Sequence, residues 1–387
     1  MTAANFLARV RDALLRAGKR IPGWRQWFPR LFPCPWVIVA PDRHQGHRLH
    51  GSALPSPTLQ RFSHNPILLP RRQHPWESRY VFNSGALYLD NRVHFVYRAV
   101  GESGQSVFGY AASRDGIQID ERADQPIYRC SQPFYAAQSG SDNPQYYESG
   151  GSSYGCEDPR LTRVGDTIYM TYTSFSGWET PPCVALTTIS VEDFLARRWH
   201  WSSPVLLSPA HEMHKNWVIF PEKFHGKFAI LHSITPDLQI DYVDSLTQVE
   251  NGSIQSHHFR DYREHQWDSW VRGAGAPPIS TPDGWLLFYQ AMDARDPDRY
   301  KLGVMLLDRD RPENVLARLS YPILEPNARY ENEGFKSGII YNCGTVLIGD
   351  RLMVYYGGAD SVLCGASISL HDLLEQLHSH PARQYRA

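Results

Sequence analysis

The chain repeats one pattern five times: a segment containing glycine, a strand, a short turn with Gly or Asp, and a second strand that ends in aromatic residues. The copies begin near residues 83, 157, 220, 275 and 342, about 65 residues apart. Short strands recurring at such a period are typical of β-propellers, in which four-stranded sheets surround a central channel. The repeat therefore predicts an all-β fold, a five-bladed β-propeller.

Apolar and polar residues alternate within the copies, as in Leu87-Tyr-Leu-Asp90, which fits sheets that pack on both faces. A pair of β-sandwich sheets would also explain many short strands, but the regular spacing favours the propeller. Helical periodicity is rare outside the two ends of the chain. It predicts a short C-terminal helix at residues 371–380.

Residues 1–60 are predicted to form an amphipathic helix and a proline-rich arm, and residues 61–387 the propeller domain. Phe6, Leu7 and Val10 lie on one side of the helix, and the prolines after residue 21 prevent it from continuing. We expect this N-terminal helical arm to pack on the main domain or on a second subunit, as in a homo-oligomer. A basic, aromatic arm could also lie on an anionic membrane surface.

The composition narrows the classes of partner. The 39 basic and 40 acidic residues give a net charge of -1, so no overall field attracts nucleic acid. The six cysteines include no Cys-x-x-Cys pair, and His211 and His214 have no evident third ligand, so no metal site is predicted. Without an apolar run of roughly 20 residues, a signal peptide or a nucleotide-binding glycine loop, the expectation is a cytoplasmic protein with no cofactor.

Residues 148–162 join a loop rich in glycine and serine to two adjacent carboxylates and then a strand. Pro159 is expected to hold Asp158 in an extended conformation at the start of that strand. Glu157, Asp158 and Arg160 would then project from one rigid point, which a catalytic carboxyl group requires. The alternative is a surface turn whose charges neutralise one another.

Equivalent positions of the five copies should converge at one end of the propeller channel. Taken singly, each charged residue there could be a salt bridge at a blade edge or a turn cap. Taken together, paired carboxylates with cationic neighbours suit glycoside cleavage, and the 11 Trp and 21 Tyr suit stacking on sugars. The candidate residues are Asn83, Ser84, Arg98, Glu157, Asp158, Arg160, Lys215, Asn216, Glu222, Asp268, Arg272, Tyr289, Glu333 and Asp360.

Six blocks resemble glycoside hydrolase family 130, the β-mannoside phosphorylases and β-mannosidases. They lie in order at residues 81–86, 155–160, 220–223, 273–279, 284–287 and 355–360. The resemblance implies a five-bladed propeller that acts with inversion at the anomeric carbon. It also implies that Asp158 is the general acid, acting in the phosphorylases through the mannosyl 3-hydroxyl. By the same resemblance Asn83 and Asp360 hold the mannosyl unit, and Arg98 lines the site.

The family divides on what attacks the anomeric carbon. Its phosphorylases gather cationic and tyrosine side chains around phosphate, whereas its β-1,2-mannosidases are thought to use a glutamate to activate water. Glu222 and Glu264 are available here as such a base. An anion pocket could be formed by Lys215, Arg272 and His232.

Two departures from the family pattern bear on the choice. Cys183 stands where many relatives have an arginine, which weakens the case for phosphate, and Gln290 stands where many have a histidine, which affects the acceptor sugar. The sequence therefore favours an inverting glycosidase for short β-mannosides, β-1,2-linked above others, with Asp158 as acid and Glu222 or Glu264 as base.

Two alternatives remain open from the sequence. One is a β-mannoside phosphorylase, which would use inorganic phosphate as co-substrate and release mannose 1-phosphate. The other is a sugar-binding propeller without chemistry. In each case the expected partner is a small oligosaccharide bound by the domain at residues 61–387, with no nucleic acid and no transmembrane segment.

Overall fold

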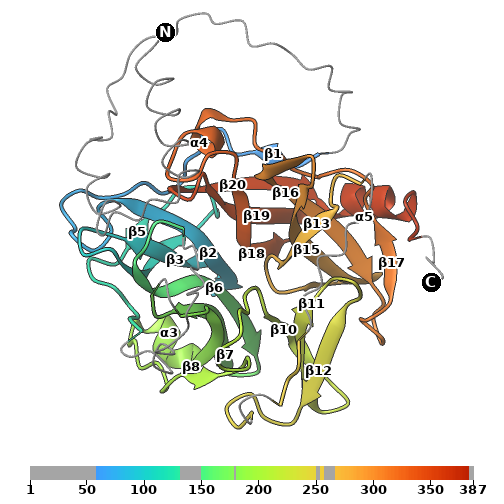
Figure 1. Cartoon of the computed structure of the whole chain (residues 1–387), viewed down its shortest axis with the longest axis horizontal. Helices are drawn as coiled ribbons and strands as arrows, with labels where there is room; N and C mark the ends of the chain where they lie inside the picture. Colours follow the sequence, from blue (N-terminus) through green and yellow to red (C-terminus); the bar gives the residue numbers. More distant parts are fainter. Residues whose placement is uncertain (1–57, 131–149, 178–179, 250–252, 257–265, 383–387) are drawn as a thin grey trace, which may run out of the picture. The chain divides into compact units, whose positions relative to one another are not determined.

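The computed structural model describes residues 58–130, 150–177, 180–249, 253–256 and 266–382 (Figure 1). Helices within these residues are limited to α3 (Val191–Leu195), α4 (Arg329–Asn332) and α5 (Leu370–His378). Strands dominate the rest, so the all-β prediction is confirmed, and α5 is the short helix expected near the C-terminal end. The predicted helix at residues 1–19 and the candidate base Glu264 lie outside the described residues.

The strands of the described residues form four sheets. The largest contains β2 (Tyr80–Leu89), β3 (Arg92–Val100), β4 (Gln105–Ser113), β5 (Glu121–Arg122), β6 (Tyr154–Val164), β7 (Thr167–Phe175), β8 (Cys183–Ser190) and β9 (Val205–Leu206). The second contains β10 (Val218–Phe224), β11 (Lys227–Ser233) and β12 (Gln239–Val243). The third contains β13 (Trp270–Ala274), β14 (Ile279–Thr281), β15 (Gly284–Asp293), β16 (Asp296–Leu307) and β17 (Val315–Arg318). The fourth contains β18 (Ile340–Ile348), β19 (Arg351–Gly358), β20 (Val362–Ser369) and β1 (Gln60–Arg61).

These sheets comprise five antiparallel repeats, because the largest sheet is two repeats joined by a short parallel pairing of β4 with β6. The repeats are β2–β5, β6–β9, β10–β12, β13–β17 and β18–β20 with β1, and each contains one of the five copies found in the sequence. β1 pairs with β20, Gln60 lying opposite Ser367, so a strand from the start of the described chain completes the last repeat. Among the described residues no sheet closes on itself.

Hydrophobic clusters join consecutive repeats. Buried side chains connect repeat 1 with 2, 2 with 3, 3 with 4, and 4 with 5. A further cluster connects repeat 5 with repeat 1, where β18 lies beside β2 (Figure 1). There Phe95 packs edge-on against Tyr355 with 4.7 Å between the ring centroids. Burial of this apolar surface is what holds the repeats against one another.

Three of the repeats contain the same buried triad, formed by an acid before the first strand, a tyrosine on the second strand and an arginine on the outer strand. The tyrosine hydroxyl donates to the acid at 2.7 to 2.9 Å in each. The arginine pairs with the acid, and in two of the triads it also donates to the tyrosine oxygen. The triads are Glu77, Tyr97 and Arg122; Asp268, Tyr289 and Arg318; and Glu331, Tyr356 and Arg61.

The first strand of every repeat contains an irregularity in its pairing with the second strand. The register shifts fall between Phe82 and Gly85, Glu157 and Arg160, Ile219 and Lys223, Val271 and Gly273, and Asn342 and Gly344. A bulge turns a side chain away from the alternation of the strand, and bulges are frequent beside active sites. The five irregularities therefore mark equivalent positions from which polar side chains can meet.

Candidate functional site

Asp158 lies in the irregularity of β6 and belongs to a buried polar cluster. Its φ is 55°, so it adopts a left-handed conformation and not the extended one expected from Pro159. The amide nitrogen of Asn83, from the equivalent irregularity of β2 and also left-handed, donates to Asp158 Oδ1 at 2.8 Å. Only 6% of the Asp158 side chain is exposed. Two irregularities thus bring together residues 75 positions apart in the chain.

Arg98 connects the acids of this cluster. Its guanidinium lies 3.2 Å from Asp158 Oδ1 and 2.8 Å from Glu157 Oε1, and it is 2% exposed. It also donates to the hydroxyl of Ser152. Lys215 approaches Glu157 from the other side, with its amine 3.1 Å from Oε2. Two cations therefore balance two carboxylates in a place that excludes most water, which is the condition under which buried charges persist.

Asp360 is a third carboxylate beside Arg98. It is 7% exposed, and burial raises its pKa to about 6, with a smaller contribution in the same direction from Asp158. Lys336 and Arg98 act against this rise. A Cβ atom at Gly150 would lie 2.9 Å from Asp360 Oδ2, so the loop before β6 can approach the carboxylate this closely only as glycine.

Arg160 and Asn216 lie behind Asp158 and bond to the protein itself. Arg160 donates to the backbone oxygens of Asp158 and Gly275 and to the side-chain oxygen of Asn216. Asn216 also accepts a hydrogen bond from the hydroxyl of Tyr341. Although both Arg160 and Asn216 were expected to contact substrate, their hydrogen bonds bind them to the scaffold around Asp158.

Other predicted residues have contacts within the fold. Ser84 is fully buried and its hydroxyl faces the backbone oxygens of Gly85 and Val96. Asp268 and Tyr289 belong to one of the repeated triads, in which both contact Arg318.

The remaining candidates lie at ion pairs or on aromatic faces. Glu222 pairs with Arg309 at 2.7 Å, with both side chains about 40% exposed. Glu333 pairs with Arg329 on the surface. His232 lies 3.1 Å from Asp241, and the exposed Arg272 rests on the rings of Trp270 and Tyr300.

The sequence did not indicate Ser152, Lys336 or Tyr341 as members of the site. Ser152 lies in the glycine-rich loop that the sequence indicated as part of the site. Nothing in the sequence distinguished it from the other serines of that loop. Lys336 and Tyr341 precede the fifth copy and reach the site only through tertiary contacts. Sequence spacing carries no signal for such contacts.

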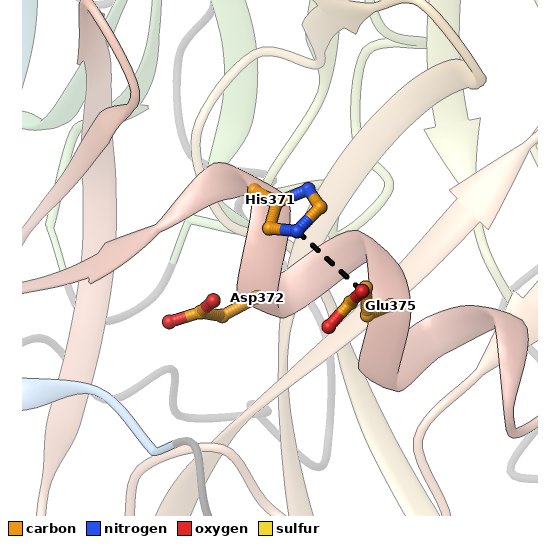
Figure 2. Close-up of side chains that lie close together, drawn as sticks. All are labelled: His371, Asp372 and Glu375. Atoms are coloured by element: carbon orange, nitrogen blue, oxygen red, sulfur yellow. Dashed lines mark ion pairs between the residues drawn. The ribbon is translucent and has the colours of Figure 1, made fainter.

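One other group of potential ligand atoms lies on α5, where His371, Asp372 and Glu375 are all exposed. His371 faces Glu375 along one side of the helix, at the distance of an ordinary pair between residues four apart (Figure 2). All three side chains are exposed, and exposed acidic groups are common without an ion, so we assign them no metal. The helices of the described residues include none that is long and apolar enough to cross a membrane.

Comparison with known proteins identifies relatives along most of the chain. The family model described as beta-1,4-mannooligosaccharide phosphorylase, Glyco_hydro_130, matches residues 58–379. A 1,2-beta-oligomannan phosphorylase of Thermoanaerobacter sp. is 32% identical over 81% of this chain and 98% of its own length. A beta-1,2-mannobiose phosphorylase of the same organism is 34% identical over 78% and 94%.

A solved structure shares the fold. The beta-1,2-mannobiose phosphorylase from Listeria innocua, in complex with beta-1,2-mannobiose, superposes with a TM-score of 0.63 and 24% identity. The superposition covers 83% of this chain and 99% of that one. The match of the family model over residues 58–379, with two relatives above 30% identity over nearly their whole length, shows that this chain belongs to glycoside hydrolase family 130.

Proposed function

We propose that this protein is a β-mannoside phosphorylase that acts on short β-1,2-linked mannosides and releases mannose 1-phosphate. The observation that carries the proposal is the buried Asp158 carboxyl group, held by Asn83 and Arg98. The activity in the names of relatives above 30% identity, among them the two Thermoanaerobacter phosphorylases, supports phosphorolysis over the hydrolysis that the sequence favoured. Glu222, one of the two candidate bases for hydrolysis, is engaged in an ion pair with Arg309.

The contacts of Asp158 suggest which of its oxygens would carry the transferred proton. Asn83 and Arg98 both donate to Oδ1, so this oxygen is already engaged as an acceptor. Oδ2 is then the oxygen that would hold the proton for the glycosidic oxygen, through the mannosyl 3-hydroxyl as the family resemblance implies. A phosphate oxygen would form a bond to the anomeric carbon while the bond to the leaving sugar breaks and that sugar takes the proton.

Cations near the cluster offer a place for phosphate. Lys215 is 25% exposed beside Glu157, and Arg272 and Lys336 both lie on the ring of Tyr300, at 5.5 and 5.0 Å from its centroid. Charged donors of this kind suit a phosphate dianion. Cys183, which replaces an arginine of many relatives, is 2% exposed and supplies no charge. Inorganic phosphate is thus proposed as co-substrate, with no cofactor.

The scaffold proposed for this site is a closed five-bladed propeller in the domain at residues 61–387. Five repeats, five equivalent irregularities and hydrophobic clusters that connect the repeats in cyclic order all support it. Completion of the last repeat by β1 supports it as well, since propellers leave only short, protected edges.

Product analysis tests the proposed function. Purified protein would be incubated with β-1,2- and β-1,4-linked mannobiose, with and without inorganic phosphate, and mannose 1-phosphate separated from free mannose. We expect mannose 1-phosphate from the β-1,2-linked substrate only when phosphate is present. Asp158→Asn should lower turnover by roughly 1,000-fold, within the range for loss of a general acid, whereas Glu222→Gln should retain it.

Two outcomes would contradict phosphorolysis. Free mannose formed at the same rate without phosphate would make the protein a hydrolase. Tight binding of mannobiose with no product under any condition would make it a sugar-binding propeller.

A further inference from the structure

Asp158 is held from behind by the buried side chain of Arg160, which is 2% exposed. The Arg160 guanidinium lies 2.8 Å from the backbone oxygen of Asp158 and 2.8 Å from that of Gly275. Its second terminal nitrogen lies 2.8 Å from Asn216 Oδ1 and 3.5 Å from the backbone oxygen of Ala274. Four of its five N–H groups therefore have acceptors within the protein. Arg160 thus connects β6 to the end of β13 and to the residue that follows it.

Asn216 is the point at which this network branches. Its side-chain oxygen accepts from Arg160 and from the hydroxyl of Tyr341, and its nitrogen donates to the backbone oxygen of Arg272 at 2.8 Å. Its φ is 67°, so both Asp158 and Asn216 are left-handed. A left-handed conformation is costly for residues other than glycine and persists where the surroundings enforce it.

Tyr341, on β18, is the member of this hydrogen-bond network farthest from Asp158 along the path of bonds. Its ring lies 5.9 Å from the Arg160 guanidinium, measured from the ring centroid, and its hydroxyl faces Asn216. Burial raises the pKa of its phenol, so the hydroxyl remains protonated and able to donate at neutral pH. Tyr341, Asn216 and Arg160 thus form a continuous path of hydrogen bonds from the fifth repeat to the backbone of Asp158.

We propose that Arg160, Asn216 and Tyr341 are positioning residues, which set the direction of the Asp158 carboxyl group by holding its backbone in the left-handed conformation. The inference rests on the proposed function only in that Asp158 must be the acid. A carboxyl group displaced by about 1 Å can lose up to 100-fold in rate while the substrate still binds. The network therefore acts on turnover and leaves affinity unchanged.

Tyr341→Phe tests the proposal because it removes one hydroxyl and retains the ring. The matched control is Tyr355→Phe, which removes the hydroxyl of another buried tyrosine, one that donates to the backbone oxygen of Gly116 at 2.8 Å, outside the network. Kinetics of phosphorolysis of β-1,2-mannobiose and thermal unfolding would be measured for both. We expect Tyr341→Phe to lower kcat about tenfold with KM within twofold of wild type, and Tyr355→Phe to keep kcat.

Asn216→Gly provides a second test, since glycine accepts the left-handed conformation without the side chain. It should lower kcat more than Tyr341→Phe, because Arg160 then loses its side-chain partner. If both variants keep wild-type kcat while Asp158→Asn is inactive, the network is only structural and the proposal fails. A raised KM at unchanged kcat would also overturn it, by indicating contact with substrate. If Asp158→Asn itself keeps full turnover, it is the proposed function that fails.

Discussion

Asp360 shows how the site raises the free energy of the folded protein. Its carboxyl group is buried beside Asp158 and Glu157, and its pKa is about 6 in the folded state against an ordinary value of 3.8. The folded protein thus binds more protons than the unfolded chain between about pH 4 and pH 6. The contribution of Asp360 to stability therefore falls as pH rises through this window, by on the order of 3 kcal/mol in total.

Asp360→Asn should remove this pH-dependent penalty. Asparagine tolerates the φ of 51° at this position and carries no charge. We expect the variant to unfold at a higher urea concentration than wild type at pH 7, to match wild type at pH 4, and to lose phosphorolysis. Asp90→Asn is the control, an exposed position with a similar φ of 48°, and should show no such gain. An equal difference at both pH values would exclude the titration of Asp360 as its cause.

At the scale of elements, close approach of two strands holds Asn83 against Asp158. A Cβ atom at Gly357, on β19, would lie 2.0 Å from Asn83 Oδ1. Glycine at this position is therefore what allows the Asn83 side chain to occupy its place beside Asp158. The site depends on the spacing of the first and fifth repeats as much as on its own side chains.

Gly357→Ala should accordingly lower kcat for phosphorolysis at least tenfold, because the methyl group displaces Asn83 from the acid. Gly303→Ala is the matched control. Its Cβ atom would lie 2.2 Å from the ring of Tyr289, in a triad outside the Asp158 cluster. We expect both variants to lower the midpoint of thermal unfolding. At temperatures below the unfolding transition, only Gly357→Ala should have a lowered kcat. Equal losses of kcat would refute the link through Asn83.

At the scale of the whole molecule, β1 contributes the arginine of the third triad. Arg61 bonds to Glu331 at 2.8 and 2.9 Å, and the Glu331 side chain is fully buried. The strand thus joins the two ends of the described chain through an ion pair as well as through β-pairing with β20. Removal of the arginine would leave a buried carboxylate without its cation.

Arg61→Met should therefore lower the free energy of unfolding by about 3 kcal/mol. Urea denaturation monitored by tryptophan fluorescence would measure the effect. The double variant Arg61→Met with Glu331→Gln should recover part of the loss, since no charge is then left buried. Arg318→Met removes the corresponding arginine from the triad of Asp268, and its effect on the free energy of unfolding can be compared with that of Arg61→Met. An Arg61→Met protein as stable as wild type would show that β1 does not secure the last repeat.

The repeats and the family could be predicted from sequence because their signals are local. Strand alternation, turn residues and the Gly-Cys-Glu-Asp-Pro-Arg block each lie within a few residues of one another. Such local signals could not show whether Asp268 and Tyr289 lie in the Asp158 cluster or in a separate triad. Equivalent positions of the repeats hold both site residues and triad residues, and only the structure separates them.

The sequence alone did not determine the direction in which each polar side chain of a strand points. A strand side chain points to one face or the other with period two, so an irregularity of one residue redirects it. The irregularities of β2 and β6 turn Asn83 and Asp158 toward each other, while Glu222, at the irregularity of β10, pairs with Arg309 instead.

The sequence by itself determined the all-β class, the five repeats and the family, because hydrophobic period and short motifs are properties of neighbouring residues. Tertiary structure decided which charges converge, since Asn83 and Asp158 are 75 residues apart and Tyr341 and Asn216 are 125 apart. Such pairs form only when the cores between repeats bring the strands together. Burial in the polar cluster that results raises the pKa of Asp360, and Arg98 lies there as the common partner of the surrounding acids.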